Sequence, residues 1–508
     1  MSKQKQNPTQ WVEDPDEFHY QLLDGRVIAD EEISVKMQRI HDRQPEKGWR
    51  TDSTGYTWDE RGMADLFSEC YAEDVRYCTE TKSWYAYDGT VWIKDTNAIF
   101  VSAKIKEFSQ LMDLYAIEIE DDEVKKRYIK FCLRLGDRRF RDRICKDAVD
   151  KMQISRTAFD ANPYLINCQN GTFDLDSMTF REHDWHDFLT YKTRFSYGMQ
   201  GLDNYRCERW EQFILEVCEG NKDKARYLQK ALGYSMLGLA NEECMFILHG
   251  KTTRNGKSTL LNTIQHMLGD YAGVVRVALI CHGRGSADAN AATPELAGTK
   301  GKRFITMAES DASGKLDEGA IKQLTGGEEI SARELYEKSF TFTPQFTLWL
   351  SCNDLPAVTD RSLFASDRLR VIEFNRHFSE AEQDKNLKTF FETEQAMRGI
   401  FTWLLAGWFL YRREGLEMPE SMRRVVDKYK KDNDLVLQFL EDQYEQDPAG
   451  RVKQKDCYEM YKIWCRKNGY PMMKVKKFKA ELMTHPEWVF DEVKYCGYPH
   501  YLGISLIQ

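Results

Sequence analysis

The amino-acid sequence predicts an α/β protein with a parallel sheet, an α+β domain before the sheet and a small helix-and-hairpin domain after it. Two observations support this fold class. Apolar strand-like runs alternate with helical runs in the middle of the chain, at 244–248, 303–308, 346–351 and 369–374. A glycine-containing loop also joins the first of these strands to a helix. Such alternation is typical of helices packed on both faces of a parallel sheet.

The part of the chain before the sheet divides into two regions. Residues 1–59 are polar and lack apolar periodicity, so we expect an extended arm. Residues 60–204 combine helical periodicity at 98–152 with two hairpin patterns, WYAYDGTVW at 84–92 and LINCQNGTFDL at 165–175. Their Asp-Gly and Asn-Gly pairs are preferred hairpin turns. We therefore expect a separate α+β domain over 60–204.

Helical patterns flank the predicted sheet on both sides. A helical linker is expected at 205–243, the sheet domain at 244–376 and a helical lid region at 377–440. Trp403 and Trp408 lie in a helical pattern over 394–412, where we expect them to contribute to the core.

The last region, 441–508, is strongly basic between 451 and 480. Helices are expected at 456–468 and 475–484, followed by a hairpin of 488–490 with 501–504. Two helices and a β-ribbon predict a winged-helix-like domain, whose second helix could contact DNA phosphates. The candidate DNA-binding residues there are Lys474, Lys476, Lys477 and Lys479. A second basic run at 125–143 is as readily a solvated helix face.

The loop after the first strand has the residue types that bind a triphosphate. The stretch HGKTTRNGKSTLLNTI covers 249–264, and Gly256-Lys257-Ser258-Thr259 offers open backbone N–H groups, an ammonium and a Mg²⁺-binding hydroxyl. The following helix directs its positive end at the same anion. The candidate nucleotide-binding residues are Gly250, Asn255, Gly256, Lys257, Ser258 and Thr259.

The spacing of this motif departs from the usual pattern. Four residues normally separate the two glycines, whereas Lys251 to Asn255 make this loop one residue longer. The end of the motif is therefore a firmer prediction than its start at Gly250. The alternative is an ordinary glycine-containing turn beside a surface lysine.

Polar residues follow the other predicted strands. Glu309 and Asp311 come after one strand and can hold Mg²⁺ or polarise water, although a strand ended by a solvent-facing acid is the plain alternative. Asn353 follows the next strand, where an amide can hold the attacking water or contact a γ-phosphate. Arg368 and Arg370 border the last strand, and an exposed arginine there can stabilise charge on a neighbour's nucleotide.

Length, composition and charge limit which classes of protein the chain can belong to. The chain has 508 residues and 42% hydrophobic residues, enough for several domains with cores, and its net charge is −9. The start, MSKQKQNPTQ, is not a signal peptide, and the apolar run at 400–410 is too short to span a bilayer. The 13 cysteines include no C-x-x-C pair. We expect a reduced cytoplasmic protein without a membrane partner.

Taken in order, GKTTRNGKST, RFITMAES, IKQLTGGEEISAREL, WLSCNDLP and DRLRVIEF resemble the superfamily 3 helicases of the phage, plasmid and poxvirus primase-helicase family. The two upstream hairpins resemble that family's accessory domain. The resemblance implies an AAA+ ATPase with ATP and Mg²⁺ as cofactors. It also implies a ring, expected to be a hexamer, that moves 3′–5′ on single-stranded DNA and acts on forked duplex DNA in phage or mobile-element replication. A bacterial cytoplasm would be its location.

The resemblance assigns roles to particular residues. Lys257 would contact the β- and γ-phosphates, Ser258 would hold Mg²⁺ and Glu309 would polarise water. Asn353 would sense the γ-phosphate, and Arg368 would act on a neighbouring subunit's nucleotide. The segment of a DNA-facing hairpin would contain Lys322, Arg333 and Lys338.

Two departures from the family pattern leave alternatives. Members often carry paired arginines before the last strand, whereas this chain has Asp367-Arg368, so Arg370 is a rival for the trans-acting role. Only the first 59 residues precede the accessory domain, too few for a primase fold, so we expect no primer synthesis and a separate primase, initiator or polymerase as a possible partner. The competing functions are an origin-binding initiator that melts duplex DNA and a nucleotide-dependent switch without translocation.

Overall fold

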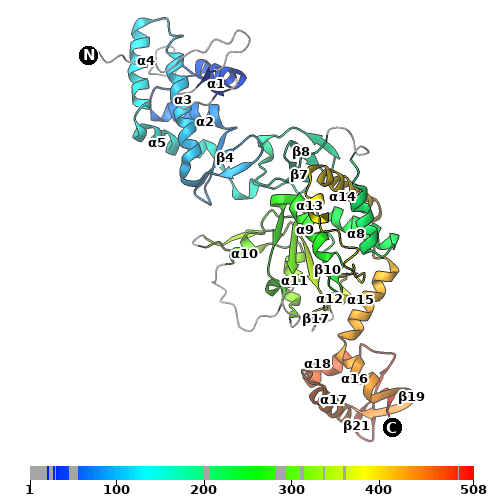
Figure 1. Cartoon of the computed structure of the whole chain (residues 1–508). Coiled ribbons are helices and arrows are strands. Elements are labelled where there is room, and N and C mark those ends of the chain that lie inside the picture. Colours follow the sequence, from blue (N-terminus) through cyan, green and yellow to red (C-terminus); the bar gives the residue numbers. More distant parts are fainter. Residues whose placement is uncertain are drawn as a thin grey trace. The chain divides into compact units, whose positions relative to one another are not determined.

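In the computed structural model, the chain forms two compact units (Figure 1). The structure describes residues 20–21, 27–28, 30–44, 55–198, 205–281, 293–308, 314–335, 338–358, 362–489 and 491–507. The first unit comprises residues 1–201 with short returns at 267–271 and 334–342, and the second comprises the remainder.

The first unit is mixed α and β. Its helices are α1 (Asp30–Asp42), α2 (Glu60–Tyr71), α3 (Ile99–Tyr115), α4 (Asp122–Leu135), α5 (Arg138–Asp147) and α6 (Val149–Met152). A four-stranded sheet has the order β5-β4-β3-β6, from Trp92–Lys94, Ser83–Tyr87, Val75–Cys78 and Gln153–Ile154. A second sheet contains β7 (Leu165–Cys168), β8 (Gly171–Asp174) and β9 (Thr179–Arg181), and β1 (Tyr20–Gln21) pairs with β2 (Val27–Ile28). Both predicted hairpins, β4–β5 and β7–β8, are present.

Helix α1 departs from the extended arm expected at 1–59. Ile40 is fully buried in the core of the first unit. Lys36 is also buried, and its Nζ lies 3.2 Å from Asp74 Oδ2 and 3.4 Å from Glu107 Oε1. The helix therefore packs partly through an ion-paired cation, which an apolar periodicity does not reveal.

The second unit contains a five-stranded parallel sheet in the order β11-β12-β16-β10-β18. Its strands are Ala272–Val274, Phe304–Ala308, Thr347–Cys352, Met245–His249 and Leu369–Glu373. Strand β10 pairs in parallel with β16 on one side and β18 on the other. The chain leaves β10 for the far edge at β11 and later returns past β10 to β18. The carboxyl end of β10 is thus a topological switch point, where α/β sheets bind ligands.

Helices surround this sheet and bury its aromatic centre. They are α7 (Glu208–Val217), α8 (Lys222–Tyr234), α9 (Lys257–Leu268), α10 (Pro294–Ala297), α11 (Glu318–Thr325), α12 (Ser362–Ala365), α13 (Leu387–Phe391) and α14 (Glu394–Glu414). Trp349 of β16 is fully buried, stacks on Phe246 at 4.3 Å and donates its indole N–H to Ser235 Oγ.

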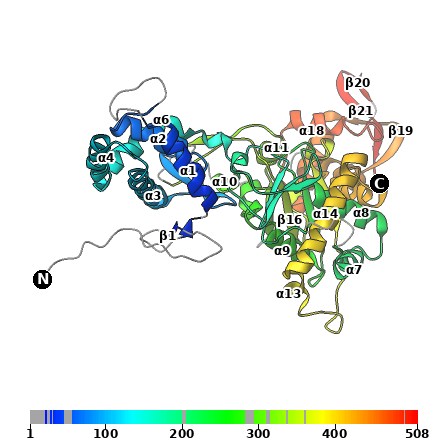
Figure 2. The ribbon, with the colours of Figure 1, turned by 90° about the horizontal axis from the view of Figure 1, so that it is seen from above.

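Helices α8 and α14 lie side by side (Figure 2). A Cβ built on Gly233 would lie 2.3 Å from the backbone nitrogen of Trp408, and one on Gly407 would lie 2.1 Å from the carbonyl oxygen of Gln229. The two helices can approach this closely only because both positions are glycine. Trp408 is 3% exposed, which confirms its expected place in the core, and Trp403 is half-buried against Trp210.

Two pairs of short strands lie outside the five-stranded sheet. β13 (Lys315–Leu316) pairs with β17 (Ala357–Val358), and β14 (Ile330–Ala332) and β15 (Phe340–Phe342) are the strands of the expected hairpin. No helix among the described residues is both long and apolar enough to cross a membrane.

The C-terminal part contains α15 (Glu420–Asp432), α16 (Leu435–Gln443), α17 (Gln454–Asn468) and α18 (Val475–Leu482). A three-stranded antiparallel sheet, here called the C-terminal sheet, has the order β19-β21-β20, from Tyr444–Lys453, Tyr498–Leu506 and Asp491–Tyr495. The two expected helices are present, but the closing hairpin is displaced. Val489 is buried in the core of this part rather than in a strand, and β19 was not expected at all.

Candidate nucleotide site

The predicted phosphate loop connects β10 to α9, and both of its glycines are required by close contacts. A Cβ on Gly250 would lie 2.4 Å from the carbonyl oxygen of Phe374, and the Gly250 N–H donates to the carbonyl of Cys352 at 3.3 Å. Gly256 has φ +89°, and a Cβ there would lie 2.5 Å from Val217 Cγ1. The longer loop therefore keeps a tightly packed glycine at each end.

Asn255 holds the shape of the loop from inside. Its side chain is 4% exposed, and Nδ2 donates to the carbonyl oxygens of Gly250 and Thr252. The segment 251–254 between these contacts is exposed. The extra residue is thus accommodated in an outward turn closed by Asn255, while the backbone at Gly256 still leads directly into α9.

Lys257 is the first residue of α9, and its ammonium links two neighbouring strand ends. Nζ donates to the carbonyl of Gly250 at 2.8 Å, to the carbonyl of Cys352 at 2.9 Å and to Asn353 Oδ1 at 3.0 Å. The residue is 5% exposed. A buried ammonium needs such polar contacts, because desolvation of an unpaired charge is costly. Lys257 and Asn353, predicted independently, are thereby brought together.

The first turn of α9 carries the other two loop residues. Ser258 is exposed and Thr259 is half-buried, so a hydroxyl is available where a bound phosphate would carry its metal ion. Glu309 and Asp311 lie outside the described residues. Strand β12 ends at Ala308, beside β16, so the chain enters that segment at the carboxyl edge of the sheet.

His249 was missed by sequence reasoning although it directly precedes Gly250. It is 8% exposed, and its Nδ1 is buried without a hydrogen-bond partner among the described residues. Burial lowers the pKa of the imidazole, assisted by Lys257 and Lys251 and opposed by Glu373. The ring lines a cavity of about 570 Å³ together with Lys251, Asp354 and Glu373. Its position at the end of the loop strand was the available signal.

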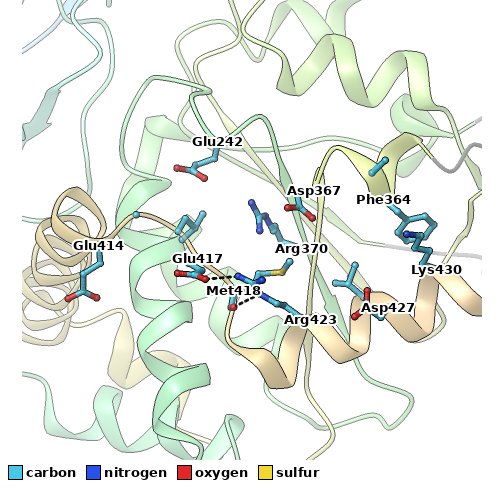
Figure 3. A pocket seen from close by; sticks show the side chains of 14 residues that line it. Glu242, Phe364, Asp367, Arg370, Glu414, Glu417, Met418, Arg423, Asp427 and Lys430 are labelled. Carbon is cyan, nitrogen blue, oxygen red and sulfur yellow. Dashed lines mark hydrogen bonds and ion pairs between the residues drawn. The ribbon is translucent and has the colours of Figure 1, made fainter.

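The two candidate arginines occupy different environments. Arg368 donates from Nη1 to Thr325 Oγ1 at 2.8 Å and to the Glu243 carbonyl at 3.1 Å, and its Nη2 lies 2.5 Å from Glu243 Oε2. Arg370 lines a cavity of about 670 Å³, where Glu242 and Asp367 lie near it (Figure 3). Burial opposes the charge of Arg370, but Tyr227, Cys244 and Asp367 raise its pKa.

The residues expected to contact DNA are distributed over several elements. Lys322 forms an ion pair with Glu318 within α11 and donates to Ser362 Oγ at 3.1 Å. Arg333 is half-buried after β14, and Lys338 is exposed before β15. Lys474, Lys476 and Lys477 are exposed along the start of α18. Lys479 is paired with Glu492 at 2.7 Å, so its charge is partly neutralised.

Comparisons with known proteins match three families along the chain. A family described as D5 N terminal like matches residues 64–219, and one described as Poxvirus D5 protein-like matches 431–499. Between them, a family of unknown function matches 248–368, which includes the phosphate loop and Asn353.

Similar proteins come from large DNA viruses. One from Acanthamoeba polyphaga mimivirus is 27% identical over 80% of this chain and 45% of its own length. One from Invertebrate iridescent virus 3 is 24% identical over 80% of this chain and 49% of its own length. Both names propose a helicase, and a relative from African swine fever virus has a name that proposes a primase. The chain spans about half the length of these relatives.

Among solved structures, the apo C-terminal region of NrS-1 aligns with a TM-score of 0.48 and 11% identity, over 88% of this chain and 99% of that one. This likeness is too loose to bear on function. The matches at both ends of the chain and the viral relatives across most of it instead agree with the ordered motifs around the loop. Together these findings support a primase-helicase family of the phage and poxvirus type for this chain.

Proposed function

We propose that this chain is an ATP-dependent DNA helicase that acts in the replication of a virus, phage or related mobile element. In this proposal it forms a ring, expected to be a hexamer, and moves 3′–5′ along single-stranded DNA. The observation that carries the proposal is the Lys257 ammonium, held between the phosphate loop and Asn353 at the carboxyl edge of the sheet. Viral relatives named as helicases support the same class of activity.

The loop fits a nucleoside triphosphate with Mg²⁺. Gly256 has no Cβ to shield the backbone N–H groups that lead into α9, and the start of this helix favours an anion. Lys257 would bind the β- and γ-phosphates, and Ser258 would hold the metal ion with Glu309 and Asp311. Mg²⁺ would neutralise charge that develops on the transferred phosphoryl group. Asn353 would hold the attacking water or the γ-phosphate, while Glu309 would accept a proton from that water.

An AAA+ core is supported by the parallel order of the five strands, with the loop strand β10 between β16 and β18. A subunit in such a ring offers an arginine to its neighbour. Arg368 is our candidate because it borders β18 outside the loop site, and its contacts with Glu243 would have to be exchanged for the neighbour's phosphate. Arg370 remains the alternative.

The DNA-binding part of the proposal rests on exposed cations. Helices α17 and α18 followed by the hairpin β20–β21 are consistent with a winged-helix-like domain, whose lysines at 474, 476 and 477 would contact phosphates. Lys322, Arg333 and Lys338 would face DNA in the ring. A relative named as a primase leaves primer synthesis open, and the expectation that this chain makes no primers stays a prediction.

The direct test is ATP-dependent strand separation on a forked duplex and on duplexes with only a 3′ or only a 5′ tail. Lys257→Ala serves as the inactive control. Native mass spectrometry of the unsubstituted chain gives the number of subunits. We expect unwinding of the fork and the 3′-tailed duplex, lost in the variant. ATP hydrolysis without strand separation on any substrate would refute the helicase, and ATP binding indifferent to DNA would favour a nucleotide-dependent switch.

A second candidate, an origin-binding initiator, is favoured by the row of exposed lysines on α18, which could also follow a duplex groove. A footprint confined to one sequence of the element's genome would support it. Footprints that do not depend on sequence would leave the helicase as the better account.

A further inference from the structure

The turn end of the hairpin formed by β20 and β21 carries exposed aromatic rings, which globular domains normally bury. Tyr495 and Tyr498 pair across the turn between β20 and β21, and they are 46% and 59% exposed. Directly paired residues of an antiparallel sheet point to the same face, so both rings share one side of the sheet. The opposite side packs on the core through Tyr501, which is 2% exposed.

Each exposed tyrosine is accompanied by a cation from β19. The Arg451 guanidinium lies 4.1 Å from the ring centroid of Tyr495, and Lys453 Nζ lies 4.7 Å from that of Tyr498. The buried His500 approaches Tyr495 edge-on at 5.8 Å and fixes the orientation of that ring. Two aromatic and cation pairs therefore lie on one face of a three-stranded sheet.

We propose that this face binds single-stranded DNA by stacking unpaired bases on Tyr498 and Tyr495 while Arg451 and Lys453 contact the phosphates. This inference rests on the proposed function and identifies how the C-terminal part would hold the displaced or tracked strand. Aromatic rings flanked by cations are the usual combination for sequence-tolerant binding of single strands. The planar guanidinium of Arg451 can also stack on a base without leaving Tyr495.

A single strand fits this surface better than a duplex does. The bases of a duplex already stack on one another and would leave the tyrosine rings unused, with only phosphates to contact the cations. Two acidic residues of β20 lie outside the pairs that Tyr495 and Tyr498 form with Arg451 and Lys453. Asp491 lies at the far end of β20, paired with Leu502, and Glu492 is engaged by Lys479.

The test is fluorescence anisotropy of the full chain without nucleotide, using labelled oligothymidylate, an abasic oligomer of equal length and a blunt hairpin duplex. Tyr498→Ala and Tyr495→Ala should each weaken oligothymidylate binding about fivefold or more, with Tyr498→Phe near the unsubstituted affinity. On the abasic oligomer the tyrosine variants should bind like the unsubstituted chain, because no base is left to stack.

The cation variants give an independent readout. Arg451→Gln and Lys453→Gln should weaken binding to both oligomers, and each should reduce the slope of log affinity against log salt by about 0.7. Matched controls are Phe390→Ala, an aromatic residue 44% exposed, and Lys385→Gln, an exposed lysine, which both lie outside the C-terminal part and should leave the affinity unchanged.

Three results would overturn the inference: unchanged oligothymidylate binding in both tyrosine variants, an equal loss on the abasic oligomer, or an equal loss on the duplex. Thermal melting of each variant checks that it is folded. The proposed function is judged separately by DNA-stimulated ATP hydrolysis of the unsubstituted chain. Unchanged binding in the tyrosine variants with intact hydrolysis thus refutes only the binding surface, and absence of hydrolysis refutes only the motor.

Discussion

Replacing Asn353 by aspartate should stabilise the nucleotide-free protein and weaken its binding of ATP. Asn353 Oδ1 accepts a hydrogen bond from Lys257 Nζ at 3.0 Å. The substitution keeps the shape of the side chain and puts a negative charge at that distance. The ammonium would then be held more firmly against the strand end, and a phosphate would have to compete with a carboxylate for it.

The magnitude follows from the geometry and from solvent screening. At 3.0 Å and an effective dielectric constant near 20, two unit charges attract by about 5 kcal/mol. Asn353 is exposed, so water reduces this value, whereas Lys257 is 5% exposed and loses little solvation when paired. We expect a net gain of about 1–2 kcal/mol, which corresponds to about 5- to 30-fold weaker ATP binding.

The assay combines thermal unfolding without nucleotide and titration with a fluorescent ATP analogue in the presence of Mg²⁺. The melting temperature should rise by about 2–4 °C per kcal/mol while the ATP affinity falls. Asn386→Asp adds the same charge at an exposed asparagine elsewhere and controls for net charge. If Asn353→Asp binds the analogue as tightly as Asn386→Asp does, Lys257 is not the phosphate ligand and the reasoning is wrong.

Three further outcomes are expected. Burial lowers the pKa of His249 in the folded chain, so the unfolded chain binds a proton at this imidazole first as the pH falls. The free energy of unfolding should therefore decrease below about pH 6.5. His249→Asn should flatten the dependence of the melting temperature on pH between 7 and 5. Gly407→Ala should destabilise the chain by about 1–3 kcal/mol, seen in thermal melting, since its Cβ would lie 2.1 Å from the Gln229 carbonyl oxygen. Arg368→Ala should lower ATP hydrolysis by about 10³-fold or more with ATP binding retained, whereas the same loss in Arg370→Ala alone would reassign the trans-acting role.

Much of the sheet and its site could be predicted because strand ends are readable in sequence. Each apolar run ends in polar residues, and parallel strands bring those ends to one edge of the sheet. Lys257 and Asn353, far apart in the chain, were each predicted to contact the γ-phosphate, and their ammonium and amide are 3.0 Å apart. Strand β11 was missed because its three residues, Ala272–Val274, are too few to show a pattern.

Other elements were missed because their burial does not follow polarity. Helix α1 buries Lys36 against Asp74 and Glu107, so its inward face contains a charge that a hydrophobic pattern counts as outward. The C-terminal sheet shows the opposite effect. Exposed tyrosines lie at the ends of β20 and β21, and β19 contains an irregularity between Asp447 and Arg451. Apolar and polar residues therefore do not alternate regularly along these strands. The apolar Val489 was mistaken for a strand because it packs into the core from a loop.

An acidic chain can still bind DNA when its cations are gathered in few places. The net charge of −9 acts over the whole surface, but at physiological salt its influence is screened beyond about 8 Å. A phosphate at the C-terminal sheet would therefore respond to Arg451 and Lys453 and to the exposed lysines of α18, not to acids elsewhere in the chain. Local cations would give such a protein affinity for DNA, and stacking on the tyrosines would make that affinity selective for unpaired bases.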